Sequence, residues 1–108
     1  MCGIVGIVGK SHLKLIDCIN DTLKHRGPDD NGVFSDHHNN LSLAMQRLAI
    51  IDITKGQQPM LDNINNNVIV FNGEIFNAAE LRSFLISRGI FFNTNNSDTE
   101  VLLKLYAK

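Results

Sequence analysis

The residue with the greatest chemical potential in this sequence is Cys2, which directly follows Met1. Removal of Met1, which is common before a small residue, leaves a thiol and a free α-amino group on one residue. An α-amino group ordinarily has a pKa of about 7.7–8.0, so a sizeable share of it can accept a proton near neutral pH. Cys2 could therefore supply both a nucleophile and its base. The alternative is a small apolar residue at the start of a buried strand.

Polar residues border apolar runs at three further places. Arg47 precedes Leu48–Ile51. Its guanidinium could hold a carboxylate through two hydrogen bonds, or it could be an ordinary surface cation. Asn72 and Gly73 could offer a side-chain amide and a backbone N–H to a developing oxyanion, or form a tight hairpin turn. Asp98 could bind an ammonium group or stabilise a helix start. Single positions leave these alternatives open.

Spacing disfavours two other kinds of site. The stretch 3–11 nearly matches a phosphate-binding loop, but five residues separate Gly3 from Gly9 where the pattern needs four, and no strand precedes it. His37 and His38 are adjacent, so on a strand they would point to opposite faces and could not share an ion. No HExxH or CxxC pattern occurs, and we expect no metal site.

The elements that must position these residues alternate between strands and helices. Short apolar, β-branched runs predict strands, in chain order Cys2–Val8, a short strand on each side of His37–Asn40, Leu48–Ile51, Val68–Phe71 and Ile90–Phe92. The segment 54–67 is typical of a loop.

Three helices are predicted, over Leu13–His25, from Asn77 to Gly89 and from Ser97 onward. Asn77 with Glu80, and Ser97 with Glu100, have the spacing of capping boxes. The predicted apolar faces consist of residues mostly three or four apart: Leu15, Ile19 and Leu23; Leu81, Phe84 and Leu85; Val101 and Leu105.

Composition limits the classes of function. The chain has 108 residues, 44% of them hydrophobic and 19% charged, which is typical of one compact domain. A net charge of −1 gives no electrostatic footprint for nucleic acid or an anionic membrane. No run approaches the ~20 apolar residues of a membrane span. Cys2 and Cys18 are too few for a disulfide scaffold, so a reducing cytoplasm fits best.

Taken together, six blocks in one order resemble the N-terminal glutaminase domain of glutamine-hydrolysing asparagine synthetases. These are class II glutamine amidotransferases of the N-terminal-nucleophile (Ntn) hydrolase group. The blocks cover nearly the whole chain: Met1–Ile4, His25–Asp30, Arg47–Asp52, Gly56–Met60, Phe71–Ile75 and Ser97–Glu100. Two departures stand out. Ala44–Gln46 replaces a usual Gly-His pair, and Phe76 replaces a usual tyrosine.

The resemblance implies an α+β fold, the αββα sandwich of Ntn hydrolases, incomplete at the C-terminus. Residues 1–108 would be a partial glutaminase domain from which the synthetase domain is absent. No cofactor is implied for this chain, since ATP and Mg belong to the synthetase domain. Glutamine is the implied small-molecule partner, with no nucleic acid or membrane, and a homo-oligomer is compatible with it.

The resemblance also implies a role for each site residue. Cys2 would attack the side-chain carboxamide of glutamine, and Asn72 with the Gly73 N–H would form the oxyanion hole. Arg47 would hold the α-carboxylate, while Glu74 and Asp98 would place the α-ammonium group. Ammonia would feed the ATP-dependent conversion of aspartate to asparagine. A catalytically silent fragment or glutamine-binding module is the alternative, because missing strands expose edges and apolar faces.

Overall fold

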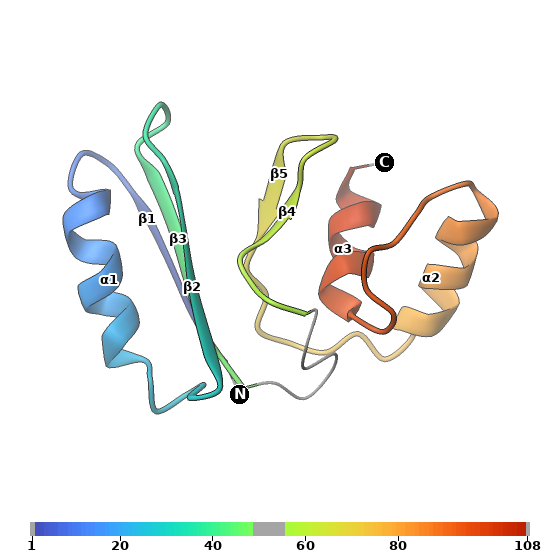
Figure 1. Ribbon diagram of the computed structural model, residues 1–108, viewed down its shortest axis with the longest axis horizontal. Coiled ribbons are helices and arrows are strands. Elements are labelled where there is room, and N and C mark those ends of the chain that lie inside the picture. The colour runs from blue at the N-terminus through green and yellow to red at the C-terminus, as the bar shows by residue number, and fades with distance from the viewer. Residues whose placement is uncertain (1, 49–55, 108) are drawn as a thin grey trace.

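The chain forms two groups of elements, each built on antiparallel strands (Figure 1). The structure, a computed structural model, describes residues 2–48 and 56–107. In chain order its elements are β1 (Gly3–Val8), α1 (His12–Thr22), β2 (Asp30–Asp36), β3 (Leu41–Arg47), β4 (Met60–Asp62), β5 (Asn67–Ile69), α2 (Ala78–Ser87) and α3 (Asp98–Tyr106).

The first group is a three-stranded sheet covered on one face by α1. The strand order is β1-β3-β2, and all neighbours are antiparallel. The register aligns Val5, Ala44 and Val33 across the sheet. Val5 and Ala44 pack with Ile16 of α1 to form the core of this group, with Leu23 against it. The face away from α1 is turned toward the rest of the chain (Figure 1).

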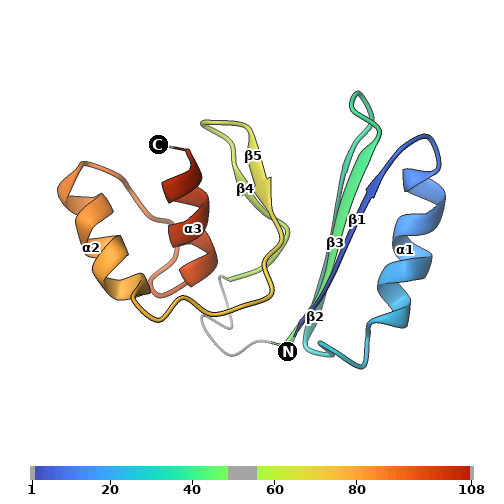
Figure 2. The ribbon, with the colours of Figure 1, turned by 180° about the vertical axis from the view of Figure 1, so that it is seen from behind.

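The second group stacks a hairpin and two helices. The two-stranded sheet β4-β5 packs against α3, and α3 packs against α2. Both views place the hairpin between the first sheet and α3, with α2 outermost (Figures 1 and 2). Among the described residues, no helix or strand of one group contacts a helix or strand of the other. The two groups therefore meet through connecting segments.

The predicted N-terminal strand and the strands beside His37–Asn40 are confirmed as β1, β2 and β3. The prediction that β1 is buried was wrong for one face, since Ile4 is 46% exposed and Val8 is 79% exposed. Of the predicted strand Leu48–Ile51, Leu48 lies beyond the end of β3, and residues 49–51 lie outside the described residues.

The loop prediction for 54–67 was wrong at Met60–Asp62 and at Asn67, which belong to the hairpin β4-β5. Asn66, with φ of 55°, supports its turn, since asparagine tolerates the left-handed region well. The strand predicted over Val68–Phe71 ends at Ile69. Pro59 lies next to Met60, the partner of Ile69, and has no N–H with which to extend the ladder.

The predicted strand Ile90–Phe92 was wrong. This segment belongs to the connection between α2 and α3, where the Arg82 guanidinium lies 4.1 Å from the centre of the Phe92 ring. The same guanidinium donates to the carbonyl oxygens of Thr94 at 2.8 Å and Ser97 at 2.9 Å. These contacts fix the connection to α2 without any strand pairing.

The three helices are confirmed, but their buried faces differ from the prediction. In α1, Leu15 and Ile19 are exposed, and the side facing the sheet carries His12, Ile16 and Asn20. This face is partly polar because the ring Nδ1 of His12 hydrogen-bonds Ser42 Oγ at 2.7 Å. Leu85 of α2 and Val101 of α3 are buried as predicted, whereas Leu81 and Leu105 are half-buried and Phe84 is exposed.

Candidate active site

One cavity of about 250 Å³ gathers every residue that the sequence singled out for chemistry. Its lining includes all six candidates, namely Cys2, Arg47, Asn72, Gly73, Glu74 and Asp98. Drug-sized ligands occupy pockets of about 300–1,000 Å³, so this volume suits a molecule of amino-acid size. The remaining lining comes from Leu48, Gly56, Gln58, Phe71, Ser97 and Thr99.

Strand pairing brings Cys2 and Arg47 together. In the antiparallel register of β1 and β3, Gly3 pairs with Gln46, so the preceding residue Cys2 lies beside Arg47 at the end of β3. The Cys2 thiol accepts the Leu48 N–H at 3.3 Å and lies 3.6 Å from the Leu48 carbonyl oxygen as donor. These contacts hold the thiol at the edge of the sheet where β1 begins and β3 ends, and Cys2 remains partly exposed.

The segment that follows α1 packs against the backbone of Arg47. Arg47 is only 5% exposed, and its carbonyl oxygen accepts the Asp29 N–H at 3.0 Å. A Cβ atom on Gly27 would collide with the backbone of Gln46 and Arg47. Close packing of this segment against the end of β3 explains why a glycine stands at position 27. The surface-cation interpretation of Arg47 was wrong.

Asn72 and Gly73 lie in the segment between β5 and α2, and no strand follows them in the described part of the chain. The hairpin interpretation of this pair was therefore wrong. Within the described ranges, neither the Asn72 carboxamide nor the Gly73 N–H has a hydrogen-bond partner. Both residues line the cavity, and two donors without internal partners suit an incoming oxygen atom.

Asp98 joins the start of α3 to this same segment. It is the first residue of α3 and is 7% exposed, and its Oδ2 accepts the Ile75 N–H at 3.0 Å. The helix N-terminus also stabilises a carboxylate there. Asp98 thus stands at the start of α3, which is one of the two alternatives that the sequence left open, and it also lines the cavity. Glu74, which precedes Ile75, adds an exposed carboxylate.

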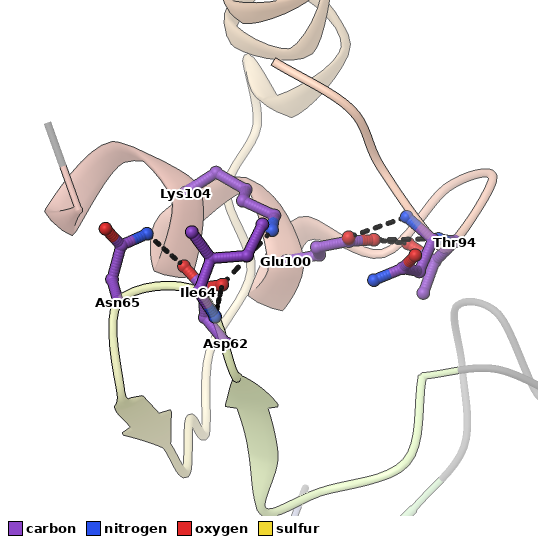
Figure 3. A network of polar contacts seen from close by, with 7 residues as sticks. Asp62, Ile64, Asn65, Thr94, Glu100 and Lys104 are labelled. Atoms are coloured by element: carbon purple, nitrogen blue, oxygen red, sulfur yellow. Dashed lines mark hydrogen bonds and ion pairs between the residues drawn. The ribbon is translucent and has the colours of Figure 1, made fainter.

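Ser97 is the N-cap residue of α3, as the capping box predicts. Ser97 Oγ accepts the Glu100 N–H at 3.3 Å. The Glu100 carboxylate does not return to Ser97; it accepts the N–H groups of Asn93 at 2.7 Å and Thr94 at 2.8 Å (Figure 3). At Asn77 the cap position of α2 is confirmed, but its side chain makes no capping hydrogen bond.

A second contact ties α3 to the hairpin (Figure 3). Lys104 of α3 lies 3.6 Å from the Asp62 carboxylate of β4. Asp62 is buried, and the Asn65 side-chain N–H donates to it at 2.7 Å. This hydrogen bond, opposed by desolvation and aided by the Ile64 N–H and Lys104, lowers the pKa of the Asp62 carboxyl group. The contacts of Glu100 hold the first turn of α3, and the Lys104–Asp62 contact holds its last turn to the hairpin.

The residues that line the cavity carry side chains of both charge signs. Arg47 comes from the sheet, whereas Glu74 and Asp98 come from the second group. Such a pair of charges complements the carboxylate and ammonium groups of an amino acid. The same cavity is lined by Cys2, Asn72 and Gly73, and a thiol with two hydrogen-bond donors is the combination needed for attack on a carbonyl group.

The sequence did not assign a role to Gln58, which is buried and lines the cavity. It stands in the block Gly56–Met60, but its contacts depend on segments distant in sequence. Cys18 is exposed on α1. Among the described residues, no group of three histidine, cysteine or acidic side chains could hold a metal ion. None of the helices in the described ranges has the length and apolarity to cross a membrane.

Comparison with known proteins points to the same chemistry. The family model described as "Glutamine amidotransferase domain" matches residues 1–108. Asparagine synthetase [glutamine-hydrolyzing] 1 of Bacillus subtilis is 44% identical over 98% of this chain and 17% of its own length. The corresponding protein of Sandersonia aurantiaca is 42% identical, over 98% and 20%. A putative asparagine synthetase of Methanocaldococcus jannaschii is 40% identical, over 100% and 24%.

This chain therefore spans less than a quarter of the length of these relatives. Its likeness to them and the family match both cover essentially all of its residues. Together they show that the chain belongs to the glutamine amidotransferase domain family, and the cavity lined by Cys2, Arg47, Asn72, Gly73, Glu74 and Asp98 agrees with this.

Proposed function

We propose that this chain hydrolyses the side-chain carboxamide of glutamine, with Cys2 as the nucleophile. The observation that carries the proposal is the cavity in which Cys2 meets Asn72, Gly73 and Arg47. Arg47 binds the α-carboxylate of glutamine, and Glu74 with Asp98 binds its α-ammonium group. These contacts direct the carboxamide of the substrate toward the thiol.

The chemistry requires that Met1 be removed, so that the α-amine of Cys2 acts as the base. The amine takes the thiol proton as the Cys2 sulfur bonds to the carboxamide carbon, and negative charge develops on the oxygen. Asn72 and the Gly73 N–H donate to that oxygen. The amine returns the proton to the nitrogen, the C–N bond breaks, and ammonia leaves. Water then attacks the thioester, which releases glutamate and regenerates the thiol.

The wider setting is proposed from the family. The described elements would belong to the αββα sandwich of Ntn hydrolases, and residues 1–108 to part of a glutaminase domain. The ammonia would serve the ATP-dependent conversion of aspartate to asparagine in a cytoplasmic synthetase. This chain itself would need no cofactor, since ATP and Mg act in the synthetase domain. Association into a homo-oligomer is compatible with this proposal.

Ammonia release from glutamine tests the proposal, with the chain processed to Cys2 and compared with Cys2→Ala. Cys18→Ala is the matched control, because Cys18 is the other cysteine and lies exposed on α1. We expect Cys2→Ala to abolish release and Cys18→Ala to retain it. A glutamine-analogue alkylator should label Cys2 alone. Equal rates in Cys2→Ala and the unaltered chain, or labelling elsewhere, would overturn the assignment. Glutamine binding without hydrolysis would identify a silent binding module instead.

A further inference from the structure

The buried side chain of Gln58 connects the segment that contains Asn72 and Gly73 to the start of α3. The Oε1 atom of Gln58 accepts the Phe71 N–H at 2.6 Å. Its Nε2 atom donates to the Phe71 carbonyl oxygen at 3.3 Å and to Thr99 Oγ1 at 3.1 Å. Phe71 immediately precedes Asn72, and Thr99 immediately follows Asp98. A single carboxamide therefore contacts both segments that carry site residues of the second group.

The reason for this arrangement lies in the hairpin. Met60 pairs with Ile69 at the end of the β4-β5 ladder, so continuing the register would place Gln58 opposite Phe71. Pro59 interrupts the ladder because it has no N–H to donate. The Gln58 side chain supplies a donor and an acceptor to the Phe71 backbone in place of a paired strand. The chain thereby stays aligned for two residues beyond the ladder and enters Asn72 in a fixed direction.

Gln58 is itself fixed by the first sheet. A Cβ atom on Gly32 of β2 would collide with the Gln58 carbonyl oxygen and contact Pro59. The backbone of Gln58 therefore lies directly against β2, while its side chain reaches Phe71 and Thr99. Because no helix or strand of the two groups touches the other within the described ranges, this contact helps to align the groups at the cavity.

We propose that Gln58 is a positioning residue for glutamine hydrolysis, acting through Phe71 on the oxyanion donors Asn72 and Gly73. The inference rests on the proposed function and deepens it. Oxyanion donors act mainly on the transition state, so displacing them lowers kcat more than it raises KM. In the proposed function Arg47, Glu74 and Asp98 bind the substrate, whereas the Gln58 carboxamide makes two of its three hydrogen bonds to Phe71, the neighbour of Asn72.

Steady-state hydrolysis by Gln58→Met tests this role, because methionine keeps the approximate volume and removes all three hydrogen bonds. We expect kcat to fall about 10- to 100-fold, since small displacements of catalytic groups have effects of this order. KM should stay within about threefold of the original value. Gln57→Met is the matched control, because Gln57 is the exposed neighbour of the same type. It should retain both constants.

Amide hydrogen exchange at Phe71 provides a readout that does not depend on activity. The Phe71 N–H should be protected in the unaltered chain and in Gln57→Met, and should exchange faster in Gln58→Met. Thr99→Val, which removes only the contact at 3.1 Å, should give the same pattern with smaller changes. Thr99→Val therefore still tests the positioning role if Gln58→Met does not fold.

The outcomes separate the inference from the function on which it rests. If the unaltered chain releases no ammonia, the proposed function is overturned. If it releases ammonia and Gln58→Met does so with the same kcat, or loses activity through KM alone, the positioning role is overturned. Unchanged exchange at Phe71 in Gln58→Met would also overturn it, whatever the activity.

Discussion

Gly27→Ala tests whether the segment after α1 positions Arg47, the residue that we propose binds the substrate carboxylate. The added Cβ would meet backbone atoms of Gln46 and Arg47, not the end of a side chain that could rotate away. The end of β3 must therefore shift. Overpacking of this kind costs about 1–3 kcal/mol of folding free energy. At about 4–8 °C per kcal/mol for a domain of this size, Tm should fall measurably.

The same shift should weaken glutamine binding. A hydrogen bond to a charged group contributes about 1.5–3 kcal/mol, and each 1.36 kcal/mol corresponds to a factor of ten. If Arg47 loses one such contact with the substrate carboxylate, KM should rise about 10- to 150-fold. The decrease in kcat should be smaller, because the Asn72–Gly73 donors come from the other group of elements.

Gly6→Ala is the matched control for this experiment. Gly6 lies in β1, and a Cβ there meets only the Leu43 Cδ2 atom at 3.4 Å. That methyl group can move, so Tm and KM should remain close to those of the unaltered chain. Thermal unfolding and steady-state ammonia release give both quantities. If Gly27→Ala keeps the original Tm and KM, or if Gly6→Ala changes them equally, the role assigned to the segment is refuted.

Three further predictions concern single side chains. Asn72→Ala should lower kcat about 10²–10³-fold and change KM much less, as steady-state kinetics will show; equal effects on hydrolysis and binding would count against an oxyanion role. Arg47→Lys keeps the charge but loses the bidentate hydrogen bonding of the guanidinium, so calorimetry should show about tenfold weaker glutamine binding. An unchanged affinity would exclude carboxylate binding by Arg47. The lowered pKa of Asp62 means that its stabilising effect is present above its unfolded pKa of about 3.9 and is lost as pH falls through the folded value. Urea unfolding of Asp62→Asn should accordingly show a free energy of unfolding about 1–3 kcal/mol lower at pH 7. That free energy should also decline less toward pH 3 than in the unaltered chain, and an equal decline would contradict the prediction.

The sequence predicted where helices and strands occur better than which side of each one is buried. Capping patterns located α2 and α3 because those signals depend on neighbouring residues. The face of α1 was misjudged because its contact with the sheet uses His12 and Asn20, which a count of apolar residues leaves out. The strand predicted over Ile90–Phe92 failed because Arg82, eight residues away at the nearest, holds that segment in another conformation. Such contacts are not visible in local sequence.

The six candidate residues could be selected from the sequence because reactive side chains stand at recognisable blocks, and all six line one cavity. Gln58 was missed because a buried glutamine has no chemistry of its own to mark it. Its importance follows from the position of Pro59 just beyond the Met60–Ile69 pair and from the close approach of Gly32 to the Gln58 backbone. Both require the register and the packing of the two groups, which spacing along the chain does not reveal.

The separation of the two groups has a consequence for the energetics of the whole chain. Glutamine would bridge them, with its carboxylate at Arg47 on β3 and its ammonium group at Asp98 on α3. A ligand at 100 times its Kd stabilises the binding-competent state by about 2.7 kcal/mol. Bound glutamine would then link the two groups so that they unfold together. Calorimetry should show a broad melting transition that sharpens into one cooperative transition as glutamine is added.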